Sequence, residues 1–331
     1  MISVVVATRN RSARLRALLD SLAQQDGPPR EVIVVDDAST DETPAVIAAA
    51  VSTRALQAAK GGGSAHTVPG GHGGGTVRGI RMPAHCGAGA ARNAGWRAGS
   101  GELVVFIDDD CVAQPGWLAA LHAAHERDPE AVVQGRTEVD PREAHRLGAF
   151  TRSQVVSGPG PWLQSCNIAY PRGLLERLGG FDESFHTTPG EDTDLGWRAI
   201  EAGTRVVYEP AAVNWHGVHE PGALGLIRAS QRWAGTVRNV RNHPQLRSAL
   251  HRGVFWKVAH ERLLLGAAGV LIARKTPALA VAAALPYLAL HRREHGSLAG
   301  TALALPAHVA LDAAEVVAMV RGSASARTLV L

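Results

Sequence analysis

Leu103-Val104-Val105-Phe106-Ile107-Asp108-Asp109-Asp110 is the stretch that decides how this chain of 331 residues folds. Its five apolar residues, mostly β-branched or aromatic, predict a strand that is buried on both faces. The strand ends in three consecutive carboxylates, which repel one another unless a cation, or a ligand that carries one, lies beside them. A solvated acidic turn that caps a helix from about residue 115 is the alternative interpretation. The rest of the chain has to decide between a ligand site and a turn.

Strand and helix patterns alternate on both sides of this stretch. Strands are predicted at 2–7, 31–35 and 131–135, and helices at 13–24, 44–59, 87–95 and 115–127. Alternation of this kind predicts right-handed βαβ units, and therefore an α/β fold with a mostly parallel sheet flanked by helices. In such sheets, ligands bind at the carboxyl ends of the strands.

A glycine-rich segment interrupts this pattern at about residues 60–80. It has no hydrophobic periodicity, so we expect a flexible surface insertion. A phosphate-binding glycine loop is the alternative, but the spacing matches neither the P-loop nor the dinucleotide fingerprint.

The pattern resumes beyond residue 160. Strands are predicted at 165–170, 204–209 and 211–216, and helices at 172–178 and 190–202. Asp192 and Asp194 lie at the start of the last helix, where the helix dipole favours carboxylates, so capping is an alternative to a functional role for both.

Composition and charge exclude some classes of function. The chain is 46% hydrophobic and 19% charged, with a net charge of +4. Nine Lys or Arg face four Asp or Glu from residue 251 onward, so the basic excess is local, which argues against a nucleic-acid-binding core and indicates a segment that meets anionic lipid. Three scattered cysteines indicate a reducing compartment, and the N-terminus resembles a first strand rather than a signal peptide.

From residue 221 the pattern is helical. Apolar stretches at 263–273, 276–290 and 298–311 are each shorter than a standard membrane span, and Pro286 and Pro306 interrupt two of them. The flanking basic pairs favour helices that lie in a membrane interface. A helical bundle that packs on the rest of the protein or on a second subunit is the alternative.

Four polar clusters at strand ends or helix starts lead to a resemblance. The chain resembles the family 2 glycosyltransferases with the GT-A fold over about residues 1–220. The matching motifs, all in the family's order, are Val5-Val6-Ala7-Thr8-Arg9-Asn10, Val34-Val35-Asp36-Asp37-Ala38-Ser39-Thr40-Asp41, Ala91-Arg92-Asn93, Phe106-Ile107-Asp108-Asp109-Asp110, Gly179-Gly180-Phe181-Asp182-Glu183 and Gly190-Glu191-Asp192-Thr193-Asp194-Leu195.

The resemblance implies a site for a nucleotide-diphosphate sugar as donor. Asp37 would bind the nucleotide base, with Thr8 and Arg9 beside it, and Arg92 would reach the nucleotide or pyrophosphate unless it only forms a helix-surface salt bridge. The three acids Asp108, Asp109 and Asp110 are similar to the family's DxD element.

The DxD element implies a divalent metal ion. Asp110 is the surer ligand and Asp108 supports it, whereas Asp109 holds either the ribose or only the turn. Oxygen ligands suit Mg²⁺ or Mn²⁺. In some relatives a histidine at a strand end completes the metal site, which would be His216 here; a structural histidine is the alternative.

The pair Glu191-Asp192 is similar to the family's catalytic acids. Inverting transfer needs a carboxylate that takes the proton of the acceptor hydroxyl, and Asp192 is expected to be this base, with Asp194 as its competitor. Trp162, Asn167 and Asp194 lie where the family builds its acceptor site, with packing as the alternative role of Trp162.

These expectations combine into one function. We expect an inverting, metal-dependent glycosyltransferase of residues 1–220, with a helical region over 221–331, that moves one sugar to a glycan, lipid-linked or small-molecule acceptor at the cytoplasmic face of the membrane. Gln231-Arg232-Trp233 departs from the motif of the processive branch, so a single addition is expected. A nucleotidyltransferase and a non-catalytic nucleotide-sugar binding module are the alternatives.

Overall fold

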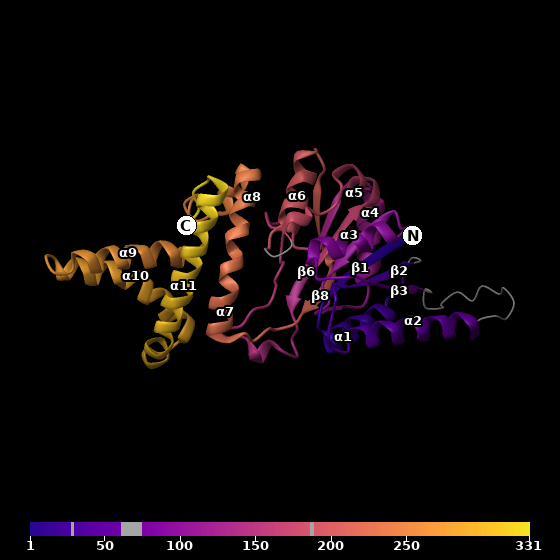
Figure 1. Cartoon of the computed structure of the whole chain (residues 1–331), viewed down its shortest axis with the longest axis horizontal. Helices are drawn as coiled ribbons and strands as arrows, with labels where there is room; N and C mark the ends of the chain where they lie inside the picture. Colours follow the sequence, from indigo (N-terminus) through magenta and orange to yellow (C-terminus); the bar gives the residue numbers. More distant parts are fainter. Residues whose placement is uncertain (28–29, 61–74, 186–188) are drawn as a thin grey trace. The chain divides into compact units, whose positions relative to one another are not determined.

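The computed structural model describes residues 1–27, 30–60, 75–185 and 189–331 (Figure 1). These form two compact units. Unit 1 contains Met1–His145, Ser153–His186 and Glu191–Val218, and unit 2 contains Arg146–Arg152, Thr187–Gly190 and His219–Leu331.

Unit 1 is built on one eight-stranded sheet with the strand order β3-β2-β1-β4-β7-β6-β8-β5. Its strands are β1 (Ile2–Thr8), β2 (Arg30–Asp36), β3 (Thr76–Arg81), β4 (Leu103–Ile107), β5 (Cys111–Ala113), β6 (Val132–Val139), β7 (Asn167–Pro171) and β8 (Val206–His216). Four neighbouring pairs, including β1 with β2 and β1 with β4, are parallel, and the three pairs that involve β7 or β5 are antiparallel. The mostly parallel sheet is confirmed, and the central strand β4 is the apolar run that precedes the three acids.

Helices cover both faces of this sheet (Figure 1). They are α1 (Ser12–Ala23), α2 (Thr43–Lys60), α3 (Ala88–Ala98), α4 (Trp117–Arg127), α5 (Arg172–Leu178) and α6 (Glu191–Glu201), with short 3-10 turns at Ala144–Arg146 and Glu183–Phe185. Val4 and Val6 of β1 pack with α1, α2 and α4, whereas Phe106 of β4 packs with α3, α5 and α6. Successive strand residues point to opposite faces, so both cores follow from the continuous apolar runs.

Three strands differ from the sequence prediction. The glycine-rich insertion was expected to reach about residue 80, but Thr76–Arg81 pairs with β2 as β3; the rest of the insertion, 61–74, lies outside the described residues. The two strands expected at 204–209 and 211–216 are one strand, β8, whose pairing shifts register opposite Gly135 and Arg136. A β-bulge of this kind re-aims the residues that follow it. Cys111–Ala113, which no pattern predicted, pairs antiparallel with β8.

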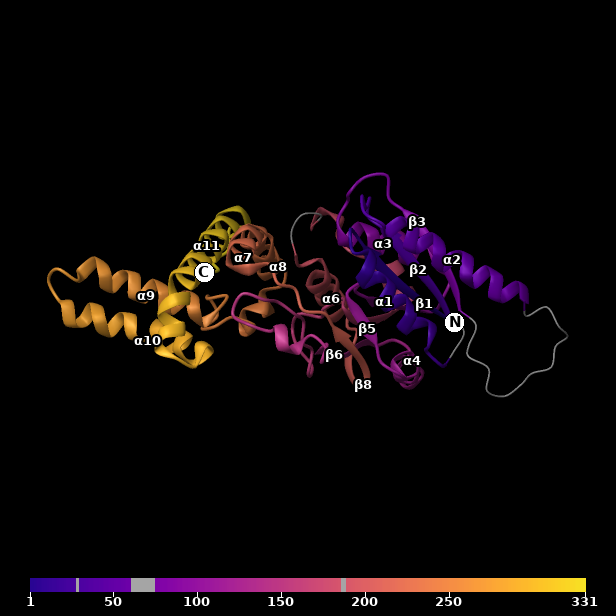
Figure 2. The same ribbon diagram turned by 90° about the horizontal axis from the view of Figure 1, so that it is seen from below.

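Unit 2 is helical, as expected (Figure 2). Its helices are α7 (Gly222–Ser230), α8 (Val237–Asn242), α9 (Val258–Ile272), α10 (Pro277–His295) and α11 (Leu298–Ala326), with 3-10 turns at Gln231–Thr236 and Pro244–Ala249. Helices α9 and α10 form an antiparallel pair in both views. Pro286 and Pro306, which were expected to interrupt apolar stretches, lie inside α10 and α11.

Helix α11 is the one helix in the described part of the chain that is long and apolar enough to cross a membrane. Its two acidic residues are nevertheless buried. Asp312 accepts a hydrogen bond from the Tyr287 hydroxyl (2.7 Å), and Glu315 forms an ion pair with Lys257 (2.5 Å) and contacts His260 (3.1 Å). These contacts hold α11 against α10 and against the start of α9.

Candidate active site

The three acids after β4 have different partners. Asp108 is partly exposed and accepts a hydrogen bond from Arg92 Nη2 (2.8 Å). Asp109 and Asp110 are buried and both accept from Arg11 Nη1 (2.8 Å each). The acidic stretch is therefore no solvated turn: two arginines hold its carboxylates in place.

Arg92 connects this stretch to the second acidic motif. Its Nη1 donates to Glu191 Oε1 (2.8 Å), at the start of α6, while its Nη2 holds Asp108. The guanidinium is buried and lies over the ring of Phe181, 5.7 Å from the centroid. Burial alone would lower the pKa of Arg92, but the carboxylates of Asp108, Glu191 and Asp192 raise it above its usual value. Arg92 is therefore a fixed charge between the two motifs, not a surface salt bridge.

Asp192 is the acid whose protonation is most perturbed at this junction. Its carboxylate accepts from the backbone N–H groups of Thr193 (2.8 Å) and Ser165 (3.4 Å). Burial and the neighbouring charge of Glu191 raise the pKa of Asp192 to about 7, against the lowering effect of Arg92. A carboxylate with such a pKa can accept a proton near neutral pH.

Arg11 is a site residue that the sequence analysis missed in favour of Arg9. Asn10 has a left-handed backbone (φ 53°), which its side chain stabilises by accepting from Thr40 N (2.7 Å). This turn leaves Arg9 exposed and brings Arg11 to the acids. Burial and Asp110 raise the pKa of Asp109 to about 6, although Arg11 and Thr8 oppose this rise.

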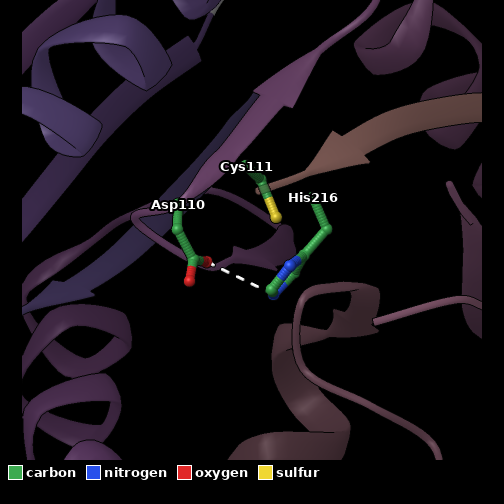
Figure 3. A group of neighbouring side chains, drawn as sticks. All are labelled: Asp110, Cys111 and His216. Carbon is green, nitrogen blue, oxygen red and sulfur yellow. Dashed lines mark ion pairs between the residues drawn. The ribbon is translucent and has the colours of Figure 1, made fainter. Parts of the chain in front are cut away.

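Asp110, Cys111 and His216 form a buried group whose potential ligand atoms lie within 4.8 Å of one another (Figure 3). Pairing of β5 with β8 sets Cys111 directly opposite His216. His216 Nδ1 donates to the carbonyl of Gly217 (2.8 Å), so Nε2, 3.4 Å from Asp110 Oδ1, carries the lone pair.

This donor set fits a divalent metal ion. Asp110 supplies an oxygen, which suits Mg²⁺ and Mn²⁺, and His216 supplies a nitrogen, which suits the transition metal Mn²⁺ better than Mg²⁺. Burial, helped by Cys166, raises the pKa of Cys111 well above its usual value, so its thiol stays protonated and is a poor ligand. Asp108, expected as a supporting ligand, accepts a hydrogen bond from Arg92 through Oδ1.

The predicted base-binding residue Asp37 holds a loop. Its carboxylate accepts from the backbone N–H groups of Cys86 (2.7 Å) and Gly87 (3.0 Å) and contacts His85 Nδ1 (2.6 Å). Asp37 thereby fixes the chain where α3 begins. Its own N–H donates to the carbonyl of Thr8 (2.9 Å), so the ends of β1 and β2 lie side by side.

The three residues predicted for the acceptor site lie in different environments. Trp162 is half-buried, and its carbonyl accepts from the Thr193 hydroxyl (2.7 Å), next to Asp192. Asp194 is buried in an ion pair with Arg198 (2.7 Å).

Asn167 has no exposed surface. Its Nδ2 donates to the carbonyls of Arg136 and Ala212 (2.8 Å each), and its Oδ1 accepts from Trp117 Nε1 (2.8 Å). This position differs from the acceptor-facing one that we expected, because the bulge of β8 needs a partner for its carbonyl.

Comparison with known proteins relates this geometry to a family. Residues 3–178 match the family model described as glycosyl transferase family 2, and residues 103–291 match that of glycosyl transferase family group 2. Validoxylamine A glucosyltransferase of Streptomyces hygroscopicus subsp. limoneus is 28% identical over 304 residues, which are 80% of this chain and 62% of that protein. The pre-mycofactocin glycosyltransferase of Mycobacterium tuberculosis is 31% identical over 228 residues, or 65% of this chain and 42% of that protein. The chain thus spans less than two thirds of the length of these relatives.

Solved structures share the fold. The mannosyltransferase PcManGT from Pyrobaculum calidifontis, in complex with GDP-Man and Mn²⁺, has a TM-score of 0.60 at 23% identity and covers 97% of this chain and 86% of that one. S. aureus TarS 1–349 in complex with UDP has a TM-score of 0.50 at 18% identity, covering 95% and 90%.

Proposed function

This chain belongs to glycosyl transferase family 2 and has the GT-A fold, and we propose that it moves one sugar, with inversion, from a nucleotide-diphosphate sugar to a glycan, lipid-linked or small-molecule acceptor. We assign the chemistry to about residues 1–220. The observation that carries the proposal is the contact of Arg92 with both Asp108 and Glu191, because it couples the acids after β4 to the start of α6, where Asp192 lies.

Asp192 is the proposed catalytic base. As the acceptor oxygen forms its bond to the anomeric carbon, the bond from that carbon to the diphosphate oxygen breaks on the opposite face, and the hydroxyl proton passes to the Asp192 carboxylate. A pKa of about 7 suits this step, since the group is largely ionised just above neutral pH and still basic enough to take the proton. Glu191, which precedes it in α6, is held by Arg92.

Asp110 and His216 are the proposed ligands of a divalent metal ion, Mg²⁺ or Mn²⁺, with Asp108 in support. When bound, the ion would neutralise the charge that develops on the departing diphosphate. Arg11 holds Asp109 and Asp110 in position from beyond the end of the neighbouring parallel strand β1. The GDP-Man and Mn²⁺ in the complex of PcManGT, and the UDP in that of TarS, are the ligand types that we propose for this chain.

The proposed contact of the acceptor is Trp162, and the proposed contacts of the donor nucleotide are Thr8, Arg9, Arg92 and Asp109. Asp37, which was expected to bind the base, would act through the loop that it holds at residues 85–87, because both of its carboxylate oxygens bind there. We further propose that the enzyme works at the cytoplasmic face of the membrane, which the α9–α10 pair contacts.

A panel of nucleotide sugars tests the proposal. The full chain is incubated with each UDP-, GDP- and TDP-sugar, with and without Mn²⁺, and release of the nucleoside diphosphate is measured together with the anomeric configuration of the product. We expect one donor to be hydrolysed slowly, with inversion at the anomeric carbon, only when Mn²⁺ or Mg²⁺ is present. Release of pyrophosphate instead would indicate nucleotidyl transfer, and a product with retained configuration would contradict the role of Asp192.

A further inference from the structure

A second group of metal-binding side chains lies in unit 2, away from the residues assigned to catalysis. Helix α10 ends in His291-Arg292-Arg293-Glu294-His295, in which two histidines four residues apart enclose a glutamate. Histidines at this spacing share one face of a helix, which is why the H-x-x-E-H pattern recurs in zinc sites. This pattern alone does not make a metal site, which also needs ligands from a neighbouring segment.

His308, from α11, lies against this end of α10. Its ring stacks on that of His291 with centroids 3.9 Å apart, and the potential ligand atoms of His291, Glu294 and His308 all lie within 4.8 Å of one another. His291 Nδ1 is 2.9 Å from Glu294 Oε2, and His308 Nε2 is 3.7 Å from that oxygen. Ligand atoms on a tetrahedral zinc ion, with bonds of about 2.0–2.2 Å, lie roughly 3.4 Å apart. The observed separations bracket this value.

The surroundings also prepare His291 as a ligand. Its Nε2 lies 3.5 Å from Asp312 Oδ2, and Asp312 is itself fixed by the Tyr287 hydroxyl (2.7 Å). A carboxylate on one ring nitrogen orients a histidine and increases the basicity of the other nitrogen, the arrangement found behind many metal-bound histidines. Here the other nitrogen, Nδ1, points to Glu294.

His295 is a further potential ligand. Its Nε2 is 2.8 Å from His308 Nε2, a distance at which two neutral rings must share one proton. A metal ion can take the place of that proton. Glu294 and His295 are also partly exposed, so the group has an open side through which an ion can enter.

We propose that His291, Glu294 and His308, with His295 as fourth ligand, bind Zn²⁺ and thereby fasten the end of α10 to α11. Three histidines beside one carboxylate distinguish this site from the Asp110 site, where one histidine lies beside the acids. The chain between the helices is only Gly296 and Ser297, and Ser297 caps α11 by accepting from Gly300 N (3.0 Å). The ion would therefore be a structural cross-link of the helical unit.

The test uses the purified full chain after removal of metals by a chelator. Zn²⁺ is titrated against a chromophoric chelator in excess Mg²⁺, in the wild type and in Asp110→Asn, which removes the proposed site of unit 1. We expect one equivalent of Zn²⁺ to remain in Asp110→Asn. Absence of that equivalent would overturn the proposal.

Variants of the two partly exposed ligands avoid a folding defect. Glu294→Gln and His295→Ala, each combined with Asp110→Asn, are expected to weaken Zn²⁺ binding at least tenfold and to abolish the rise in melting temperature that Zn²⁺ causes. Arg293→Ala, an exposed neighbour on the same helix, is the matched control and should bind as the parent does. Unchanged Zn²⁺ affinity in both ligand variants would contradict the site, as would Co²⁺ binding without the visible absorption of a tetrahedral centre.

Discussion

Arg92 donates a 2.8 Å hydrogen bond to Glu191, which lies 99 residues further along the chain. The other Nη atom of the same guanidinium donates to Asp108. Two acidic motifs that the sequence keeps far apart are thus held by one buried cation. We therefore expect the positions of the donor and of the proposed catalytic base to be coupled through this side chain.

Arg92→Lys should uncouple the two acidic motifs. A lysine keeps the charge but has one compact donor group and cannot span both carboxylates. We expect kcat/KM to fall about a hundredfold, the effect of misplacing reacting groups by about 1 Å, with a loss of about 1–3 kcal/mol in the free energy of unfolding. Arg97→Lys, on the exposed side of the same helix, is the control. Equal activity in both variants would refute the coupling.

Asp192→Asn should remove the base. We expect kcat to fall by about 10²–10⁴-fold while donor binding is kept, because the amide cannot take the proton. Turnover and donor affinity are measured separately, by product release and calorimetry. Full turnover in Asp192→Asn would transfer the role to another group.

The pH dependence of the wild type follows from the same acid. Because the pKa of Asp192 is raised to about 7 and the ionised form is the active one, kcat/KM should rise about tenfold per pH unit below pH 7 and level off above it. Glu191→Gln removes a charge that raises the pKa of Asp192, so the profile should move to lower pH. Arg92→Met removes a charge that lowers it, so the profile should move to higher pH. Shifts in the same direction would contradict the assignment.

Arg11 and a metal ion should compete for the same acids. Arg11 donates to Asp109 and to Asp110 Oδ2, and its positive charge opposes a divalent ion at Asp110 Oδ1, the oxygen that faces His216. Arg11→Met removes this repulsion between nearby charges, so it should bind Mn²⁺ about tenfold more tightly in calorimetry without nucleotide. Arg16→Met, exposed on α1, should bind as the wild type does. Weaker Mn²⁺ binding by Arg11→Met would show that Arg11 assists the metal.

Features that depend on one strand or helix were predictable from the sequence. The apolar run 103–107, the acids that follow it and the acids at the start of α6 are local patterns, and parallel pairing of β1, β2 and β4 brings the strand ends together. His216 was also predictable, as a polar residue at a strand end.

Features that depend on how distant segments turn were not predictable. Arg11 reaches the acids only because Asn10 adopts a left-handed backbone, and nothing in the two arginines of that loop distinguishes Arg11 from Arg9. Likewise Asn167 was expected to face an acceptor because the family builds its acceptor site in this region, whereas the bulge of β8 presents a carbonyl that this side chain satisfies.

Asn167→Ala distinguishes a structural role of this side chain from a role in acceptor binding. It would leave Trp117 Nε1 and the carbonyls of Arg136 and Ala212 without their side-chain partner, at a cost of about 3 kcal/mol in the free energy of unfolding, measured in urea. Gln24→Ala, at an exposed position, should cost far less. Where the variant remains folded, the KM for the acceptor should be unchanged. A large rise in KM with normal stability would restore the acceptor role.

The α9–α10 pair should bind anionic membranes. It exposes Val270 (68%), Leu271 (86%) and Val281 (61%), with the exposed bases Arg274 and Lys275 between the helices. Apolar side chains beside basic residues are typical of helices that insert into the interface. Each basic residue near an anionic surface contributes about 1 kcal/mol, so Arg274→Gln with Lys275→Gln should weaken binding to phosphatidylserine vesicles about thirtyfold, and salt should weaken wild-type binding. Leu271→Glu should also release the protein, whereas Leu329→Glu, exposed (55%) but outside the pair, should not. If both substitutions within the pair left sedimentation with vesicles unchanged, the exposed apolar surface would have to serve another partner.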